Sequence, residues 1–498
     1  MIKRYFALKD NTITNAFDRS LTIRGTGSNM GQADIIEVFT IYAQVSNSSG
    51  LSTEKSRGII EFDLSEITAD SNPTGTKYFL KMYNAKHPFT LPRDYTMEIL
   101  ALSAEWEEGR GLDMDNYTDL TYDITGSNWI RRKGSTSWGT QGGSTHASPI
   151  FTANFPVGDE DLEVDVTTLV DQWIAGSKTN YGMMIRMSSS LESAPESFFT
   201  KKFFARSTEF YFSRPVLEAR FDDSKQDDRG QFYLSSSLAT GEDNLNTLYL
   251  YNYVRGRLRN IPSLTDGKIG LSLFSSSAGS PTGDELILVA DGTHVRAASQ
   301  LAVTGGIVPG ETGIYSASVA FTGSSGLTGV SDVWFKLADT VAGAADTSNQ
   351  FFTGTISPKT LAAYSYADTD KYIFSVSNRN NSYAHDQTHR VRVYARTKNW
   401  SPNIYNVAST VPDSLVFPSA SYEICRTVDD RVVIPYGTGS TNHTRLSYDV
   451  SGSYFDLDTS ILEPNYIYEV KLSVYDPDVN TYEEQPFSYK FRVVKNEY

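Results

Sequence analysis

Three aspartates in the stretch from Gly111 to Asp119 have the residue type and spacing to bind a metal ion. They are Asp113, Asp115 and Asp119. Alternate acidic side chains in a loop can converge on calcium, which accepts six to eight oxygen ligands. The turn glycine and distal glutamate of an EF-hand loop are absent from this stretch, so a solvated acidic loop is the alternative interpretation. Calcium bound by these aspartates is kept as a hypothesis, and no other cofactor is expected.

Four tryptophans in the first 180 residues could offer flat faces to a sugar or a protein partner. Core packing is the commoner fate of this side chain, and we expect it for Trp106 and Trp173. Trp129 and Trp138 lie in a Gly-, Ser- and Arg-rich stretch, residues 126–143, which is predicted to be a long loop. Long loops often carry contacts. Trp129 and Trp138 are therefore predicted to be exposed, as candidate residues for glycan or partner binding.

Two further patterns resemble catalytic or metal-binding motifs but lack the required geometry. Glu107 and Glu108 are adjacent, so on an extended chain they point to opposite faces, and no second carboxylate of a glycosidase pair is identifiable. His385 and His389 have the spacing of a helical zinc motif. A loop followed by a strand is expected there, which would separate them by about 13 Å. No Ser–His–Asp triad or phosphate-binding glycine loop is evident. The sequence therefore predicts a protein that is not an enzyme.

The composition favours sheets over helices and disfavours two classes of partner. Aromatic residues make up 12% of the 498 residues, with 30 Tyr and 26 Phe, and such residues suit the half-buried surface of a sheet. The net charge is −15, from 59 acidic and 44 basic residues. A nucleic-acid binder needs a basic face for phosphates, and an anionic membrane repels acidic proteins. No nucleic-acid partner is therefore expected.

The single cysteine and the short apolar runs bear on disulfide bonding, export and membrane insertion. Cys425 alone rules out a disulfide within the chain, and it is expected to be a small core residue. The first ten residues lack the apolar stretch of an export signal. No segment has the roughly 20 apolar residues needed to span a bilayer. We therefore expect folding in a cytoplasm, without membrane insertion.

Alternation with a period of two is the dominant pattern along the chain. Apolar residues occupy every second position in residues 58–64, 389–396, 466–474 and 487–493. One polar and one apolar face per strand is typical of antiparallel sheets packed as sandwiches. The predicted fold class is therefore all-β.

Only one stretch has the pattern of an amphipathic helix. Its apolar stripe has the spacing i, i+3, i+4 and i+7. The stripe consists of Val166, Leu169, Val170 and Trp173, with Asp165 placed as N-cap and Gly176 as C-terminal stop.

Composition also suggests the domain boundaries. Residues 222–230 are charged and contain no apolar side chain, so they are interpreted as a linker. Residues 338–350 are small and polar and form a second soft region. The predicted domains are a large β-sandwich over residues 1–222 and two immunoglobulin-like sandwiches over residues 230–340 and 350–498. The last has about seven candidate strands, as an immunoglobulin-like sandwich does.

A set of short motifs in the first domain resembles a known family. The motifs are Ser56–Asp63, Leu80–Ala85, Trp106–Gly109, Asn128–Trp129, Trp138–Gly139, Asp165–Gly176 and Asn180–Gly182. They resemble the DNRLRE-type β-sandwich domain of cell-surface and carbohydrate-associated proteins. The most specific part is the last block, a strand leading to a short helix that ends in Trp and Gly and is followed by Asn-Tyr-Gly.

The whole arrangement resembles virion structural proteins of T-even-like tailed phages of marine bacteria. The resemblance rests on the domain order, on residues 8–17 and on residues 27–31. It implies a neck, tail, baseplate or fibre protein that is assembled in the host cytoplasm and located in the virion. Its partners would be other virion proteins and copies of itself in a homo-oligomeric array. The alternative is a carbohydrate-binding adhesin that attaches to host surface glycans.

Overall fold

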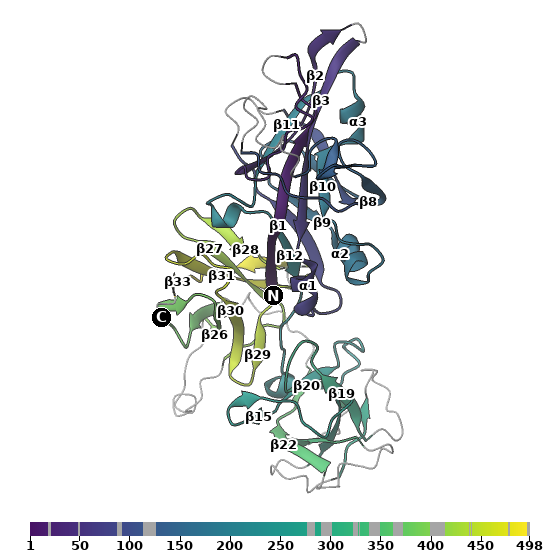
Figure 1. The fold of residues 1–498 in the computed structure, drawn as a ribbon. Coiled ribbons are helices and arrows are strands. Elements are labelled where there is room, and N and C mark those ends of the chain that lie inside the picture. Colours follow the sequence, from purple (N-terminus) through teal and green to yellow (C-terminus); the bar gives the residue numbers. More distant parts are fainter. Residues whose placement is uncertain are drawn as a thin grey trace. The chain divides into compact units, whose positions relative to one another are not determined.

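The computed structural model describes the chain except residues 18–20, 48–49, 87–91, 113–125, 276–283, 290–300, 322–326, 328, 338–348, 362–371, 399–413, 438, 440, 477–478 and 496–498. The described chain forms two compact units, Met1–Phe221 (unit 1) and Asp222–Tyr498 (unit 2). Both consist mainly of antiparallel strands (Figure 1), which confirms the predicted all-β fold class. Among the described residues, no helix has the length and apolarity to cross a bilayer.

Unit 1 is built on a ten-stranded arrangement in the order β8-β5-β10-β3-β1-β12-β4-β9, with β2 on β3 and β11 on β2. Its strands are β1 (Ile2–Thr14), β2 (Ile35–Asn47), β3 (Gly50–Phe62), β4 (Lys77–Met82), β5 (Tyr95–Leu102), β6 (Arg131–Lys133), β7 (Thr136–Ser137), β8 (Thr145–Phe155), β9 (Leu162–Asp165), β10 (Met183–Met187), β11 (Phe198–Phe204) and β12 (Val216–Arg220). Its helices are α1 (Leu64–Ala69), α2 (Thr167–Ile174), α3 (Ser189–Ser193) and the 3-10 turn η1 (Tyr211–Ser213).

Strand β1 changes partner halfway along its length, which joins the two layers of unit 1 (Figure 1). Residues 2–6 pair with β12, and residues 7–14 pair with β3. The register shifts between Ala7 and Lys9, so Leu8 is the extra residue of a β-bulge. A bulge bends its strand and increases the local twist. The buried faces of β3, β5 and β10 then meet those of β4, β9 and β12 in one core.

The helix predicted at residues 165–176 is confirmed as α2. Leu169, Val170 and Trp173 are buried in the core of unit 1. The Asp165 carboxylate accepts a hydrogen bond from the Thr167 N–H at 2.9 Å, which satisfies a free donor of the first turn. Gly176 follows with φ +70°, the left-handed conformation that ends a helix. The short helices α1 and α3, of 6 and 5 residues, were not predicted.

Unit 2 contains two lobes, which we call the middle lobe (residues 231–361) and the C-terminal lobe (residues 372–495). The middle lobe has β13 (Tyr233–Leu234), β14 (Asn246–Tyr251), β15 (Tyr253–Val254), β16 (Arg257–Leu258), β17 (Lys268–Phe274), β18 (Leu288–Val289), β19 (Val303–Ile307), β20 (Ile314–Phe321), β21 (Val330–Phe335), β22 (Gln350–Ile356) and β23 (Lys359–Thr360). The C-terminal lobe has β24 (Tyr372–Val376), β25 (Ser382–Ala384), β26 (Thr388–Thr397), β27 (Ala420–Arg426), β28 (Arg431–Ile434), β29 (Ser447–Asp449), β30 (Gly452–Asp458), β31 (Ile467–Asp476), β32 (Thr481–Glu484) and β33 (Tyr489–Val494).

The middle lobe extends further along the chain than its predicted boundary at residue 340. Its main sheet has the order β14-β20-β19-β17-β21-β22. Strand β22 begins at Gln350 and pairs with β21, so residues 350–356, predicted to open the third domain, lie in the sheet of the middle lobe. Residues 338–348 of the second soft region lie outside the described residues.

The C-terminal lobe consists of a four-stranded sheet, β24-β26-β30-β29, and a six-stranded sheet around β31. The rings of Tyr422 on β27 and Phe455 on β30 stack at 4.4 Å between them. The alternation predicted here is confirmed, since Val391, Val393 and Ala395 are buried on β26. On β31 and β33 the alternate residues from Tyr468 to Val474 and from Tyr489 to Val493 are also buried. Buried Cys425 lies on β27 as expected, where burial is the main cause that raises the pKa of its thiol to about 12.

The charged segment 222–230, predicted to be a linker, instead packs between the two lobes of unit 2. Toward the C-terminal lobe, the Lys225 N–H donates to Ser447 Oγ at 3.0 Å and the Asp227 N–H to the Tyr448 carbonyl at 3.0 Å. The Tyr448 hydroxyl donates to Asp228 at 2.6 Å. The linker interpretation is wrong because the charges of this segment are paired and partly buried rather than solvated.

Toward the middle lobe, the same segment makes two ion pairs. Lys225 pairs with Glu311 at 2.6 Å. The Arg229 guanidinium donates to both oxygens of Asp332, at 2.6 and 2.7 Å. Asp332 lies on β21, is fully buried, and also accepts from Trp334 Nε1 at 2.8 Å. Because these contacts reach both lobes, the segment joins them into one body.

Removing the buried partner of this segment should destabilise unit 2. Asp332→Ala leaves the Arg229 guanidinium and the Trp334 N–H without their acceptor, which should cost about 3–5 kcal/mol. Urea unfolding of the full chain, read by hydrogen exchange in peptides of β17 and β21, measures the change. Asp456→Ala is the matched control, since its pair with Arg390 is partly exposed and is worth at most about 1 kcal/mol. Equal losses in the two variants would contradict this assignment.

Candidate functional site

The predicted calcium ligands cannot be placed in the structure. Asp113, Asp115 and Asp119 lie outside the described residues, and the calcium hypothesis stays a prediction. Within the described part of the chain, no three or more His, Cys, Asp or Glu side chains are grouped so as to hold a metal ion. His385 and His389 flank the start of β26, as the loop-then-strand interpretation requires.

Trp129 and Trp138 are buried, with 6% and 5% of their surface exposed, so the prediction that they are exposed is wrong. They form a second core cluster with Ile13, Trp106 and Met184, among others. The stretch 126–143 includes the β6–β7 hairpin and folds back onto the sheet. The Gly142 N–H donates to the Trp129 carbonyl at 2.7 Å. Gly142 has φ +80°, and a Cβ there would lie 2.7 Å from the Trp129 ring, so only glycine allows this closure.

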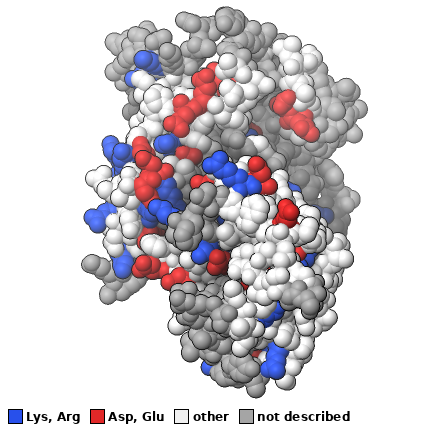
Figure 2. Space-filling view, turned by 90° about the horizontal axis from the view of Figure 1, so that it is seen from above, with Lys and Arg blue, Asp and Glu red and all other residues white. Residues whose placement is uncertain are grey.

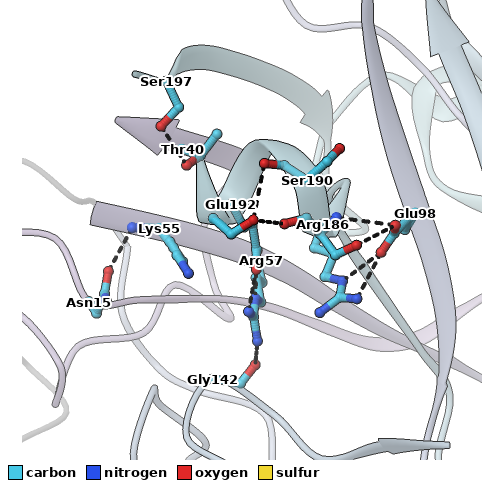
Figure 3. Close-up of polar contacts among 12 residues, drawn as sticks. Asn15, Thr40, Lys55, Arg57, Glu98, Gly142, Arg186, Ser190, Glu192 and Ser197 are labelled. Carbon is cyan, nitrogen blue, oxygen red and sulfur yellow. Dashed lines mark hydrogen bonds and ion pairs between the residues drawn. The ribbon is translucent and has the colours of Figure 1, made fainter. Parts of the chain in front are cut away.

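Arg57 and Glu192 form a buried ion pair (Figure 3), and its guanidinium lies over the Trp129 ring. Arg57 on β3 donates to both oxygens of Glu192 on α3, at 2.8 and 2.5 Å. Its remaining nitrogen donates to the Gly142 carbonyl at 2.7 Å. The guanidinium lies 5.0 Å from the centre of the Trp129 ring, within the range of a cation–π contact. The tryptophan face that the sequence offered to a glycan is therefore occupied by an arginine of the same unit.

Two further cations lie beside this pair. Arg186 on β10 pairs with Glu98 on β5 at 2.8 Å (Figure 3). The pKa of Lys55 on β3 is lowered, first by burial and then by Arg57 and Arg186, while Glu192 opposes the shift. The two arginines donate hydrogen bonds to carboxylates and a carbonyl of unit 1, so this cluster holds β3, β5, β10 and α3 together.

The acidic residues around Trp106 also make structural contacts. Trp106 is buried, as predicted, and its Nε1–H donates to the Tyr181 carbonyl at 2.9 Å. Glu108 accepts two hydrogen bonds from the Arg206 guanidinium, at 2.7 and 2.5 Å. It also accepts from the Asp10 N–H at 3.0 Å. One carboxylate considered for acid–base chemistry is thus held in an ion pair.

Asp10 is the carboxyl group with the most perturbed titration in this region. It is fully buried, and one oxygen accepts from the Arg206 N–H at 2.6 Å. Its other oxygen has no hydrogen-bond partner among the described residues. Burial raises the pKa of Asp10 to about 7, with nearby Glu108 adding to the rise against the Arg206 hydrogen bond.

The surface of unit 1 also carries two pairs of partly exposed aromatic rings, linked in sequence through the adjacent residues Phe210 and Tyr211, which we together call the aromatic surface. It consists of Phe6, Phe204, Phe210 and Tyr211. The rings of Phe6 and Tyr211 lie 5.5 Å apart, and those of Phe204 and Phe210 lie 5.7 Å apart. Phe210 is 56% exposed, and Leu8, the bulge residue two positions after Phe6, is 54% exposed. No local sequence pattern predicts these rings to be neighbours, because they come from β1, β11 and the residues around η1.

Charges on the molecular surface are mixed in sign. On the face drawn in Figure 2, acidic and basic side chains are interspersed. Within the C-terminal lobe, cross-strand ion pairs bring opposite charges together, such as Arg390 with Asp456 at 2.9 Å and Arg392 with Asp449 at 2.9 Å.

Comparison with known proteins assigns no family to the chain. No family model and no curated protein matches the chain. Among solved structures, fibronectin(III)-like modules of Clostridium thermocellum CbhA match at 8% identity, over 56% of this chain and 95% of that one, with a TM-score of 0.15. A chimeric titin Z1Z2 tandem matches at 9% identity, over 56% and 98%, with a TM-score of 0.15. The assignment of this chain as a multi-domain β-sandwich protein rests on its own sheets.

The titration of Asp10 should make unit 1 less stable as the pH rises. Its pKa is 3.8 in the unfolded chain and about 7 in the fold, so between these values the unfolded chain has released a proton that the folded protein retains. Stability is therefore lost over this window as the pH increases. Asp10→Asn is neutral throughout and should gain on the order of 2–4 kcal/mol relative to the wild type between pH 4 and 7.5. Melting curves of both proteins across this range measure the difference, and parallel curves would contradict the assignment.

Proposed function

We propose that this chain is a structural component of a tailed-phage virion and acts through contacts with other virion proteins and with copies of itself. The aromatic surface of unit 1 is the observation that supports this proposal most. Partly exposed aromatic rings grouped on one surface are enriched at protein interfaces, where they bury a large area with little loss of side-chain freedom. The resemblance of the first domain to DNRLRE-type sandwiches belongs to the same proposal.

The construction of unit 2 supports the same role. The segment 222–230 ties its two lobes together through bidentate and backbone hydrogen bonds on both sides. A body of two joined sandwiches keeps its binding surfaces at a fixed separation. A spacer in a symmetric particle needs this property, because each copy must meet its neighbours in the same geometry.

The structure gives less support to the alternative adhesin in the form predicted from the sequence. That form used Trp129 and Trp138 as a stacking face for glycans. Both rings are buried, and Trp129 is covered by Arg57. A direct glycan contact at these two residues would require the 126–143 stretch to open.

Substitutions on the aromatic surface test the proposed function. Phe210→Ser removes an exposed ring and should reduce incorporation of the chain into particles at least about tenfold, since loss of a hot-spot aromatic from an interface costs about 2 kcal/mol or more. Complementation of a phage lacking the gene, followed by quantitative mass spectrometry of purified particles, measures incorporation. Phe198→Ser is the matched control, because Phe198 is 68% exposed on the same unit and lies outside the aromatic surface. Wild-type incorporation of the Phe210→Ser protein would contradict the proposal.

A further inference from the structure

Unit 2 contains an open cleft of about 590 Å³ between its two lobes. The middle lobe contributes Tyr233, Asn246 and Tyr249, and the C-terminal lobe contributes Arg445 and Tyr448. The segment 222–230 also contributes polar side chains to the lining of the cleft, including Gln226 and Asp228. We propose that this cleft binds a neutral saccharide.

The lining combines the two kinds of group that saccharides need. Tyr233 and Tyr249 are half-buried and both line the cleft. An aromatic ring offers an apolar face to the C–H side of a sugar and a hydroxyl to its polar edge. Carboxylate, amide and guanidinium groups around these rings supply the acceptors and donors that sugar hydroxyls require.

The polar groups are held in place before any ligand arrives. Asp228 accepts from the Tyr448 hydroxyl at 2.6 Å and from the Thr247 N–H at 2.6 Å. Arg445 Nε donates to the Pro418 carbonyl at 2.8 Å, and Gln226 Nε2 donates to the same oxygen at 2.9 Å. These bonds fix the directions of the remaining donors and acceptors. A ligand therefore binds without the entropic cost of ordering the walls.

The charge of the lining selects among saccharides. Four carboxylates face the cleft, from Asp222, Asp228, Glu242 and Asp243, against one arginine among the lining residues. This excess of negative charge repels uronates and other anionic sugars and has no effect on a neutral one. The saccharide site is independent of the proposed function. It is formed by side chains of unit 2, whereas the aromatic surface lies on unit 1.

Titration calorimetry of the full chain with three oligosaccharides tests the inference. The probes are maltohexaose and N-acetylglucosamine hexamer, which are neutral, and a mannuronate hexamer, which is anionic. At least one neutral hexamer should bind, and the mannuronate hexamer should not. Tyr233→Ala should weaken that binding about tenfold, through loss of a stacking ring. Tyr253→Ala is the matched control, because Tyr253 is 61% exposed in the same lobe and lies outside the cleft lining.

A second variant keeps the test decisive if Tyr233→Ala fails to fold. Arg445→Gln removes a donor at the opposite wall and should weaken binding several-fold, with its melting temperature checked against the wild type. The inference is overturned if neither neutral hexamer binds, or if the mannuronate hexamer binds as well as they do. It is also overturned if folded Tyr233→Ala or Arg445→Gln protein binds with wild-type affinity.

Discussion

The need to pair the buried charges of residues 222–230 determines how unit 2 is built. A segment with lysine, arginine and three aspartates within seven residues can be buried only if each charge meets a partner, since an unpaired buried charge costs several kcal/mol. Asp332 and Glu311 supply those partners from the middle lobe, and Ser447 and Tyr448 bind the segment from the C-terminal lobe. The two lobes are thereby fixed to one strip of chain, and the cleft that they enclose has ordered walls.

Pairing of buried charges also determines part of the structure of unit 1. Arg57 and Glu192 come from elements 135 residues apart and meet above a tryptophan. Their pairing closes the 126–143 stretch and turns a potential binding face into core. The rings of the aromatic surface, from β1, β11 and the residues around η1, are left partly exposed. The proposal that this chain acts through protein contacts rests on this difference. The Trp129 ring is covered by Arg57, whereas the rings of the aromatic surface are partly exposed.

Sequence reasoning succeeded where the signal is local. Alternation identified β26, β31 and β33, and the i, i+3, i+4 stripe located α2 to within two residues, because both patterns depend on neighbours along the chain. It failed for Trp129, Trp138 and the segment 222–230, whose environments depend on partners far away in sequence. A charged stretch without apolar residues has the composition of a linker, and nothing local shows that Asp332, 103 residues beyond Arg229, is its counter-ion. The aromatic surface was missed for the same reason.

A cryo-EM reconstruction of the purified particle tests the central claim most directly. The account predicts that density for this chain repeats with the symmetry of the particle and that Phe6, Phe204, Phe210 and Tyr211 are buried against a neighbouring subunit. A particle that lacks the chain would contradict it. So would a particle in which the chain is present but these four rings face solvent in every copy.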